Sequence, residues 1–152
     1  MKTYTNIDLF NAICISLFDE LYSSFPKEKD INIKSITRSI YRDDIDISFN
    51  EAFEYSSYGE DVISFLKEEG FIKSAGTMQS TSDELQVRLT LKGLTILGAI
   101  PSSISGEKQE SIINRIKNVV NNGIEEAGKD VTQSIVMDVF KASLGMFQAI
   151  AF

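Results

Sequence analysis

Residues 62–72 read Val-Ile-Ser-Phe-Leu-Lys-Glu-Glu-Gly-Phe-Ile, and this stretch carries the clearest structural signal in the chain. Val62, Phe65 and Leu66 recur at helical spacing, so we expect these three side chains to face the core. Gly70 follows the last helical turn, where a glycine in the left-handed conformation commonly ends a helix. The stretch therefore predicts a helix that stops at a glycine and continues as extended chain.

Two strands and another helix are expected after this glycine. Residues 71–75 and 85–89 read as two strands, and the Ser- and Thr-rich segment 76–84 between them predicts a hairpin with a long tip. Thr90 is suited to cap a further helix over 91–100, because a threonine hydroxyl accepts a hydrogen bond from the first helical turn. The proline at the next position ends that helix.

The segments that precede residue 58 are mostly helical in pattern. Residues 6–25 carry apolar side chains at helical spacing, with Asn6 as the expected N-cap. Residues 31–33 alternate like a short strand, and a second helical segment is expected over 35–41. The pattern at 43–57 combines strand-like and helix-like spacing, so both interpretations stay open there.

The last third of the chain is set apart by a serine-rich linker at 102–106. We therefore expect a first domain over residues 1–101 and a helical extension over 107–152. In the extension, isoleucine and valine recur at steps of three and four residues. This predicts one long amphipathic helix, or two helices broken near Gly123 or Gly128. Three roles stay open for its apolar stripe: packing against the first domain, a homodimer seam, or binding at a membrane surface.

The order of these elements resembles the winged helix-turn-helix domain over residues 7–100. Residues 62–72 are similar to the third helix of that domain, which runs through a glycine into the first wing strand. Leu-Thr-Leu-Lys-Gly-Leu at 89–94 is similar to the step that follows the wing in many bacterial regulators. The resemblance implies a mainly α-helical domain with a small β-hairpin wing. In DNA-binding members of the family, the helix before the wing enters the major groove.

The helix before the wing lacks the residues that DNA reading requires. Contacts with base edges and phosphates use Arg, Lys, Asn or Gln, and phosphate repels carboxylates. The predicted wing tip, residues 74–84, has no arginine and ends in two acidic residues. The helix positions that would face DNA are Tyr58, Glu60, Asp61, Ser64, Lys67 and Glu68. This composition argues against DNA binding through that helix.

The negative charge of the chain is concentrated in one segment. The formal net charge is −7, and residues 43–69 alone hold nine acidic residues and one basic residue, so the rest of the chain is close to neutral. One interpretation is a solvated acidic face with its aromatic residues buried in the core. The other is a docking surface for a basic partner, because aromatic residues anchor interfaces and complementary charge guides association. The residues of this predicted surface are Asp43, Asp44, Asp46, Glu51, Glu54, Tyr55, Tyr58, Glu60 and Asp61.

The sequence offers little catalytic chemistry. It has no histidine, which removes Ser-His-Asp arrangements and histidine-containing metal sites. Cys14, the single cysteine, lies in an apolar run and is expected to be buried and inert. Asp44 begins a segment spaced like a calcium loop, but Phe49 and Tyr55 stand where that loop needs glycine and glutamate. A Mg²⁺ site built from the aspartates at 43–46 alone stays open. We expect a protein that is not an enzyme and has no cofactor.

Partner and location follow from these observations. The chain shows neither a signal peptide nor a run of about 18 apolar residues, so we expect a cytoplasmic protein that does not enter the membrane. The favoured function is a protein-binding inhibitor, such as an immunity or antitoxin protein that neutralises a basic, nuclease-like toxin. Small acidic immunity proteins of bacteria resemble the chain in physical type, without a shared motif. The alternative is a dimeric winged-helix transcription regulator, and its DNA contacts would come from the one segment with basic excess: Lys27, Lys29, Lys34, Arg38 and Arg42.

Overall fold

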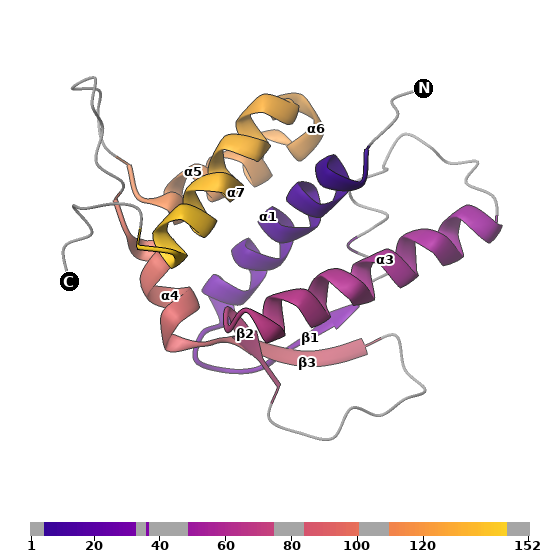
Figure 1. The fold of residues 1–152 in the computed structure, drawn as a ribbon, viewed down its shortest axis with the longest axis horizontal. Helices are drawn as coiled ribbons and strands as arrows, with labels where there is room; N and C mark the ends of the chain where they lie inside the picture. The colour runs from indigo at the N-terminus through magenta and orange to yellow at the C-terminus, as the bar shows by residue number, and fades with distance from the viewer. Residues whose placement is uncertain (1–4, 33–35, 37–48, 75–83, 101–109, 146–152) are drawn as a thin grey trace.

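The protein is mainly α-helical and carries a small antiparallel sheet of three strands (Figure 1). The first helix, α1 (Asn6–Ser24), lies at the centre, and elements from the middle and the end of the chain pack against it. The computed structural model describes residues 5–32, 36, 49–74, 84–100 and 110–145.

Helix α1 begins with a reciprocal cap. The Oγ1 atom of Thr5 accepts a hydrogen bond from the backbone N–H of Asp8 at 3.1 Å, and the Asp8 carboxylate accepts one from the backbone N–H of Thr5 at 3.3 Å. The prediction of Asn6 as the N-cap was therefore wrong by one residue. This capping box satisfies two backbone donors at once, and the pair Thr5 and Asp8 is spaced to form it. Of the apolar side chains predicted to face the core, Ala12, Ile13, Leu17 and Leu21 are buried, as is Cys14, whereas Phe10 is half-buried and Ile7 is 53% exposed.

The sheet packs on one side of α1. Its strands, in chain order, are β1 (Lys29–Asn32), β2 (Ile72–Lys73) and β3 (Glu84–Leu89), and their spatial order is β1-β3-β2. The antiparallel pairing of Ile72 with Leu89 confirms the two strands predicted on either side of the hairpin. Strand β1 includes residues 31–32 of the strand predicted at 31–33 but begins two residues earlier, and it pairs with the other edge of β3; residue 33 lies outside the described ranges. Because alternate residues face the same side of a strand, the inner face of the sheet includes Ile31, Ile72, Val87 and Leu89, which are all buried.

Helix α3 (Phe49–Glu68) shows that part of the segment 43–57, which the sequence left open between strand and helix, is helical. Residues 49–57 are helical and continuous with the helix predicted from residue 58, whereas residues 43–48 lie outside the described ranges. After α3 the backbone turns at Gly70 with φ +84°, as predicted. Of the second helical segment expected at 35–41, the structure describes Ile36, which is helical and buried.

Thr90 joins the start of α4 (Leu91–Gly98) to the end of α3. Its Oγ1 atom accepts a hydrogen bond from the backbone N–H of Gly93 at 3.0 Å, which confirms the predicted cap, and donates one to the carbonyl oxygen of Gly70 at 2.6 Å. The backbone N–H of Thr90 donates to the carbonyl oxygen of Phe71 at 3.0 Å. That same oxygen lies only 2.4 Å from where a Cβ atom at Gly93 would stand. The threonine and the glycine of the 89–94 motif are thus both needed for this close contact.

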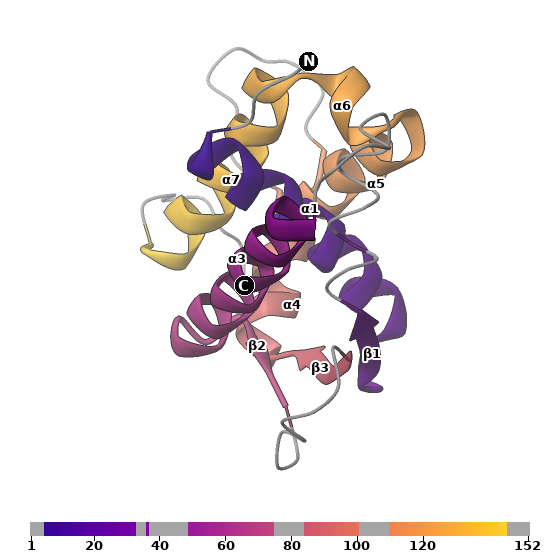
Figure 2. The same cartoon turned by 90° about the vertical axis from the view of Figure 1, so that its right-hand side faces the viewer.

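The C-terminal region forms three helices, α5 (Ile112–Asn122), α6 (Ile124–Ala127) and α7 (Lys129–Ser143). The chain breaks at both predicted glycines, Gly123 with φ +96° and Gly128 with φ +90°, a backbone region that favours glycine. Figures 1 and 2 show α1 between these helices and the sheet. Most of the apolar stripe packs in the same core as α1, with Ile112, Ile113, Ile116, Ile135 and Val139 buried, whereas Val131 is 45% exposed. The predicted linker at 102–106 lies outside the described residues, and the homodimer stays a prediction.

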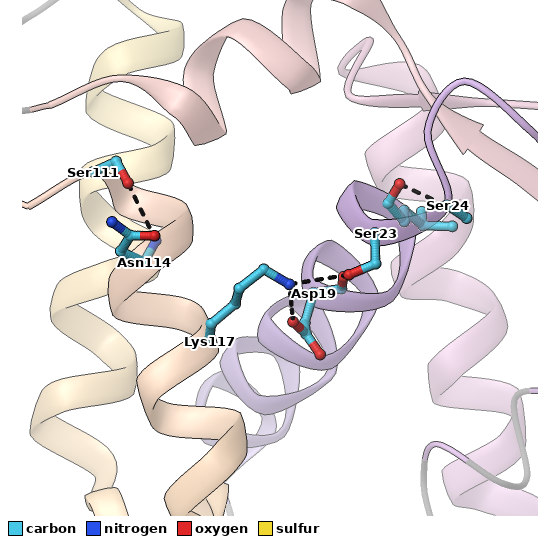
Figure 3. Close-up of polar contacts among 7 residues, drawn as sticks. Asp19, Ser23, Ser24, Ser111, Asn114 and Lys117 are labelled. Carbon is cyan, nitrogen blue, oxygen red and sulfur yellow. Dashed lines mark hydrogen bonds and ion pairs between the residues drawn. The ribbon is translucent and has the colours of Figure 1, made fainter.

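Polar contacts also join α5 to α1 (Figure 3). The Nζ atom of Lys117 lies 3.1 Å from a carboxylate oxygen of Asp19 and 3.0 Å from the Oγ atom of Ser23. The hydroxyl of Ser111 caps α5 by accepting a hydrogen bond from the backbone N–H of Asn114 at 3.3 Å. These contacts are partly exposed, so we expect them to orient the two helices more than to stabilise them.

Candidate protein-binding surface

The C-terminal half of α3 presents an acidic face to solvent. Glu60, Asp61, Glu68 and Glu69 are all exposed. Among the residues that the structure describes, none of these four carboxylates forms an ion pair with another side chain. The carboxylates are therefore turned outward on the helix that directly precedes the hairpin.

Tyr58 holds the N-terminal part of this face against α1. Its phenol donates a hydrogen bond to the backbone carbonyl oxygen of Asn6 at 2.5 Å. Partial burial raises the pKa of the Tyr58 phenol above its ordinary value, and the nearby Cys14 and Asp61 raise it further. The side chain is half-buried. Tyr58 is therefore a fixed, neutral hydrogen-bond donor at the border of the acidic face.

The predicted partner-binding residues fall into three groups. Tyr58, Glu60 and Asp61 lie together on α3, as described above. Glu51, Glu54 and Tyr55 lie on the first half of the same helix, where only the backbone is described. The third group lies outside the described residues and consists of Asp43, Asp44 and Asp46.

Phe65 is a component of this surface that the sequence analysis placed wrongly. It was expected to face the core with Val62 and Leu66, yet its side chain is 40% exposed, whereas those two are 3% and 0% exposed. At about 100° per residue, Phe65 stands at the border of the apolar face of α3. Its ring makes edge contacts with Phe10 of α1, at a centroid distance of 5.6 Å, and with Phe140 of α7, at 6.2 Å. Three helices therefore contribute aromatic rings to one exposed cluster.

A second feature that the sequence analysis missed is a basic pair on the outer face of the sheet. Lys73 of β2 lies directly opposite Arg88 of β3, with Lys73 exposed and Arg88 half-buried. Like charges in directly opposed positions destabilise a strand pair. Both residues alternate with buried neighbours, Ile72 before Lys73 and Val87 before Arg88, and this alternation is the signal that could have identified them.

The described part of the chain shows few signs of other chemistry. Cys14 is fully buried, and burial raises the pKa of its thiol well above the ordinary value, which agrees with the expectation of an inert side chain. Within the described ranges, no group of three His, Cys, Asp or Glu residues could hold a metal ion, and the aspartates at 43–46 lie outside them. None of the described helices combines the length and the hydropathy needed to cross a membrane.

The class of protein that the structure defines is a mainly α-helical fold with a small three-stranded antiparallel sheet, a shape compatible with a winged helix. No protein-family model, curated protein or solved structure matches the chain.

Proposed function

We propose that the protein is a non-enzymatic inhibitor that binds a basic protein partner through the acidic face of α3, most concretely an immunity or antitoxin protein that covers the positive surface of a nuclease-like toxin. The observation that carries this proposal is the outward orientation of Glu60, Asp61, Glu68 and Glu69 on the helix before the hairpin. Close pairs of opposite charge across an interface speed association and select the partner. A cationic partner is the natural ligand of such a face.

We further propose that the scaffold is a winged helix. The succession of helix, turn at Gly70, hairpin and capped helix supports this assignment, as does the contact of Thr90 and Gly93 with the end of α3. In this arrangement the hairpin is the wing and α3 is the helix before it. A winged helix that carries carboxylates on this helix is suited to a protein ligand and not to DNA.

The test is affinity capture with the full-length chain from the lysate of its own cells, followed by mass spectrometry. We expect a basic protein that is retained at low salt and released as ionic strength rises, because exposed charges are screened within about 3 Å at 1 M salt compared with about 10 Å at 0.1 M. Replacement of Glu60 and Asp61 by lysine is expected to abolish capture, and the same replacement at Asp43, Asp44 and Asp46 to weaken it.

The matched control is Glu126→Lys, which reverses an exposed charge on α6, away from α3. Capture that survives high salt and charge reversal on α3, or that is lost equally with Glu126→Lys, would show that the acidic face is not the binding surface. Loss of nuclease activity of the captured partner on adding the chain would identify it as an inhibitor.

The second candidate is a DNA-binding regulator, and the observation in its favour is the unusual pairing of Lys73 with Arg88 in the hairpin. Cationic wing strands can contact phosphates without reading sequence. Of the basic segment considered for DNA contacts, Lys27 is exposed and Lys29 half-buried, and the other three residues lie outside the described ranges. A mobility shift at low salt that disappears in Lys73→Glu with Arg88→Glu would favour this candidate over the inhibitor.

A further inference from the structure

An exposed apolar surface lies beside the acidic face of α3. We define the Phe65 surface as Phe10, Phe65, Met137, Phe140 and Leu144. Phe65, Met137 and Leu144 are 40%, 46% and 74% exposed, and the rings of Phe10 and Phe140 are half-buried and stack at a centroid distance of 5.9 Å. Helix α1 packs against both α3 and α7, so the three helices that supply these residues are neighbours (Figure 1).

The α7 part of this surface is elongated along the helix axis. Met137, Phe140 and Leu144 follow one another at steps of three and four residues and therefore share one side of α7 and its C-terminal end. At a rise of 1.5 Å per residue, they span roughly 10 Å. That length matches about two turns of a docking helix, whose own apolar side chains recur at the same steps.

Charge defines what can cover this surface. Asp61 precedes Phe65 by four residues, and Glu68 and Glu69 follow it by three and four, so all three carboxylates lie within one helical turn of the exposed ring. On the α7 side the exposed charge next to Phe140 is a cation, Lys141. The border of the apolar surface is therefore negative along α3 and carries one cation, Lys141, beside Phe140.

We infer that the Phe65 surface is the anchoring part of the binding surface and that its occupant is an amphipathic, cationic helical segment of the partner protein. The apolar side of that segment covers Phe65 and Phe140, and its lysine or arginine side chains face Asp61 and Glu68. This inference rests on the proposed function, because it names the part of the basic partner that the acidic face receives. Aromatic residues that are partly exposed in the free protein and become buried in the complex are the usual energetic centre of such interfaces.

The probe is a synthetic helical peptide with leucine at positions i, i+3, i+4 and i+7 and lysine elsewhere, titrated by fluorescence anisotropy into the full chain. There are two control peptides. The first has the same composition in scrambled order, and the second has glutamate in place of every lysine. We expect the lysine peptide alone to bind, with NMR shift changes at Phe65 and Phe140. Phe65→Ala is expected to weaken binding by about tenfold or more, and this effect should persist at high salt.

Charge and apolar controls separate the inference from general stickiness. Asp61→Lys with Glu68→Lys is expected to abolish binding at low salt, whereas Glu126→Lys on α6 and Leu91→Ala on α4, which removes a side chain that is 73% exposed, should leave it unchanged. Circular dichroism melting of each variant shows whether it is folded. Unchanged affinity in folded Phe65→Ala, or equal binding of the glutamate peptide, overturns the inference.

Other occupants give different outcomes. If the chain sediments as a dimer that Phe65→Ala converts to a monomer, the occupant of the Phe65 surface is a second copy of the chain. If the peptide binds only after removal of residues 146–152, the occupant is that segment of the same chain. Either result overturns the inference. The two proposals also fail separately. A captured basic partner that depends on Glu60 and Asp61 but tolerates Phe65→Ala leaves the inhibitor standing and removes this inference. Absence of any salt-sensitive basic partner removes the inhibitor, whatever the peptide does.

Discussion

Replacement of Gly93 by alanine tests the contact on which the junction between hairpin and α4 depends. The added Cβ atom would stand 2.4 Å from the carbonyl oxygen of Phe71 and 3.3 Å from a methyl carbon of Leu89. Carbon and oxygen approach to about 3.3 Å in ordinary close contacts. The backbone at Phe71 must therefore move by roughly 1 Å, and this backbone oxygen also accepts the hydrogen bond from the Thr90 N–H.

The sign of the effect depends on three contributions. Overpacking of a tight contact costs about 1–3 kcal/mol. Weakening of the Thr90 cap and of its bond to Phe71 adds about 1 kcal/mol. Alanine gains up to about 1 kcal/mol over glycine through helix propensity. We therefore expect Gly93→Ala to lower the free energy of unfolding by about 2 kcal/mol, which for a chain of this length lowers the Tm by roughly 4–8 °C.

The assay is thermal and urea denaturation followed by circular dichroism, with Gly98→Ala as the control. Gly98 lies in the same helix, but a Cβ atom there would meet only the Tyr22 hydroxyl at an ordinary 3.9 Å. Gly98→Ala is therefore expected to be neutral or stabilising by about 0.5 kcal/mol, since propensity acts without a clash. A Tm for Gly93→Ala equal to or above that of the wild type would refute this prediction, because it would mean that the backbone at Phe71 can move without any loss of stability.

Three further predictions concern groups away from this junction. The Cys14 thiol is buried and its pKa is raised, so we expect no reaction with a thiol reagent at mildly alkaline pH in the native protein. In denaturant the thiol should react fully. Rapid labelling of the native protein would contradict the burial. The Lys117–Asp19 pair is 39% and 22% exposed, so a double-mutant cycle with Lys117→Met and Asp19→Asn should give a coupling below about 1 kcal/mol. The hydrogen bond from Thr5 lowers the pKa of the Asp8 carboxyl from its ordinary 3.8. The ionised carboxylate therefore stabilises the fold above pH 3.8, and this stabilisation is lost as the pH falls through the lowered pKa. In NMR titrations, Thr5→Ala should return the pKa of Asp8 toward 3.8, and an unchanged pKa would exclude Thr5 as the cause of the shift.

The parts of the fold that the sequence predicted correctly depend on local chemistry. The turn at Gly70, the cap at Thr90 and the breaks at Gly123 and Gly128 each follow from the conformation or hydrogen bonding of one residue and its near neighbours. The pairing of β1 with β3 was missed because it joins residues far apart in the sequence, and a four-residue strand carries little pattern of its own. The start of α3 at 49–57 was left open because the strand-like alternation of residues 44–49 runs directly into the helical spacing of Phe49 and Phe53.

The candidate surface was predictable in charge but not in shape. Glu60 and Asp61 could be placed on the exposed side of α3 because charged residues are seldom buried without a partner. Phe65 was misplaced because helical phase shows which side of a helix is apolar, but not how far the neighbouring helices extend over it. Phe10 and Phe140 belong to helices at opposite ends of the chain, so their contact with Phe65 follows from the tertiary fold alone.

The position of α1 at the centre of the core has a consequence for synthesis on the ribosome. Two of the helices that enclose α1, α5 and α7, are translated after the sheet and α3, so one side of α1 stays uncovered while most of the described elements emerge. Complete folding must then wait for α5 and α7, and the nascent chain carries a partly uncovered apolar helix until these two helices have emerged. A fragment that stops before residue 112 would leave the α5- and α7-facing side of α1 uncovered and would be a substrate for chaperones and proteases.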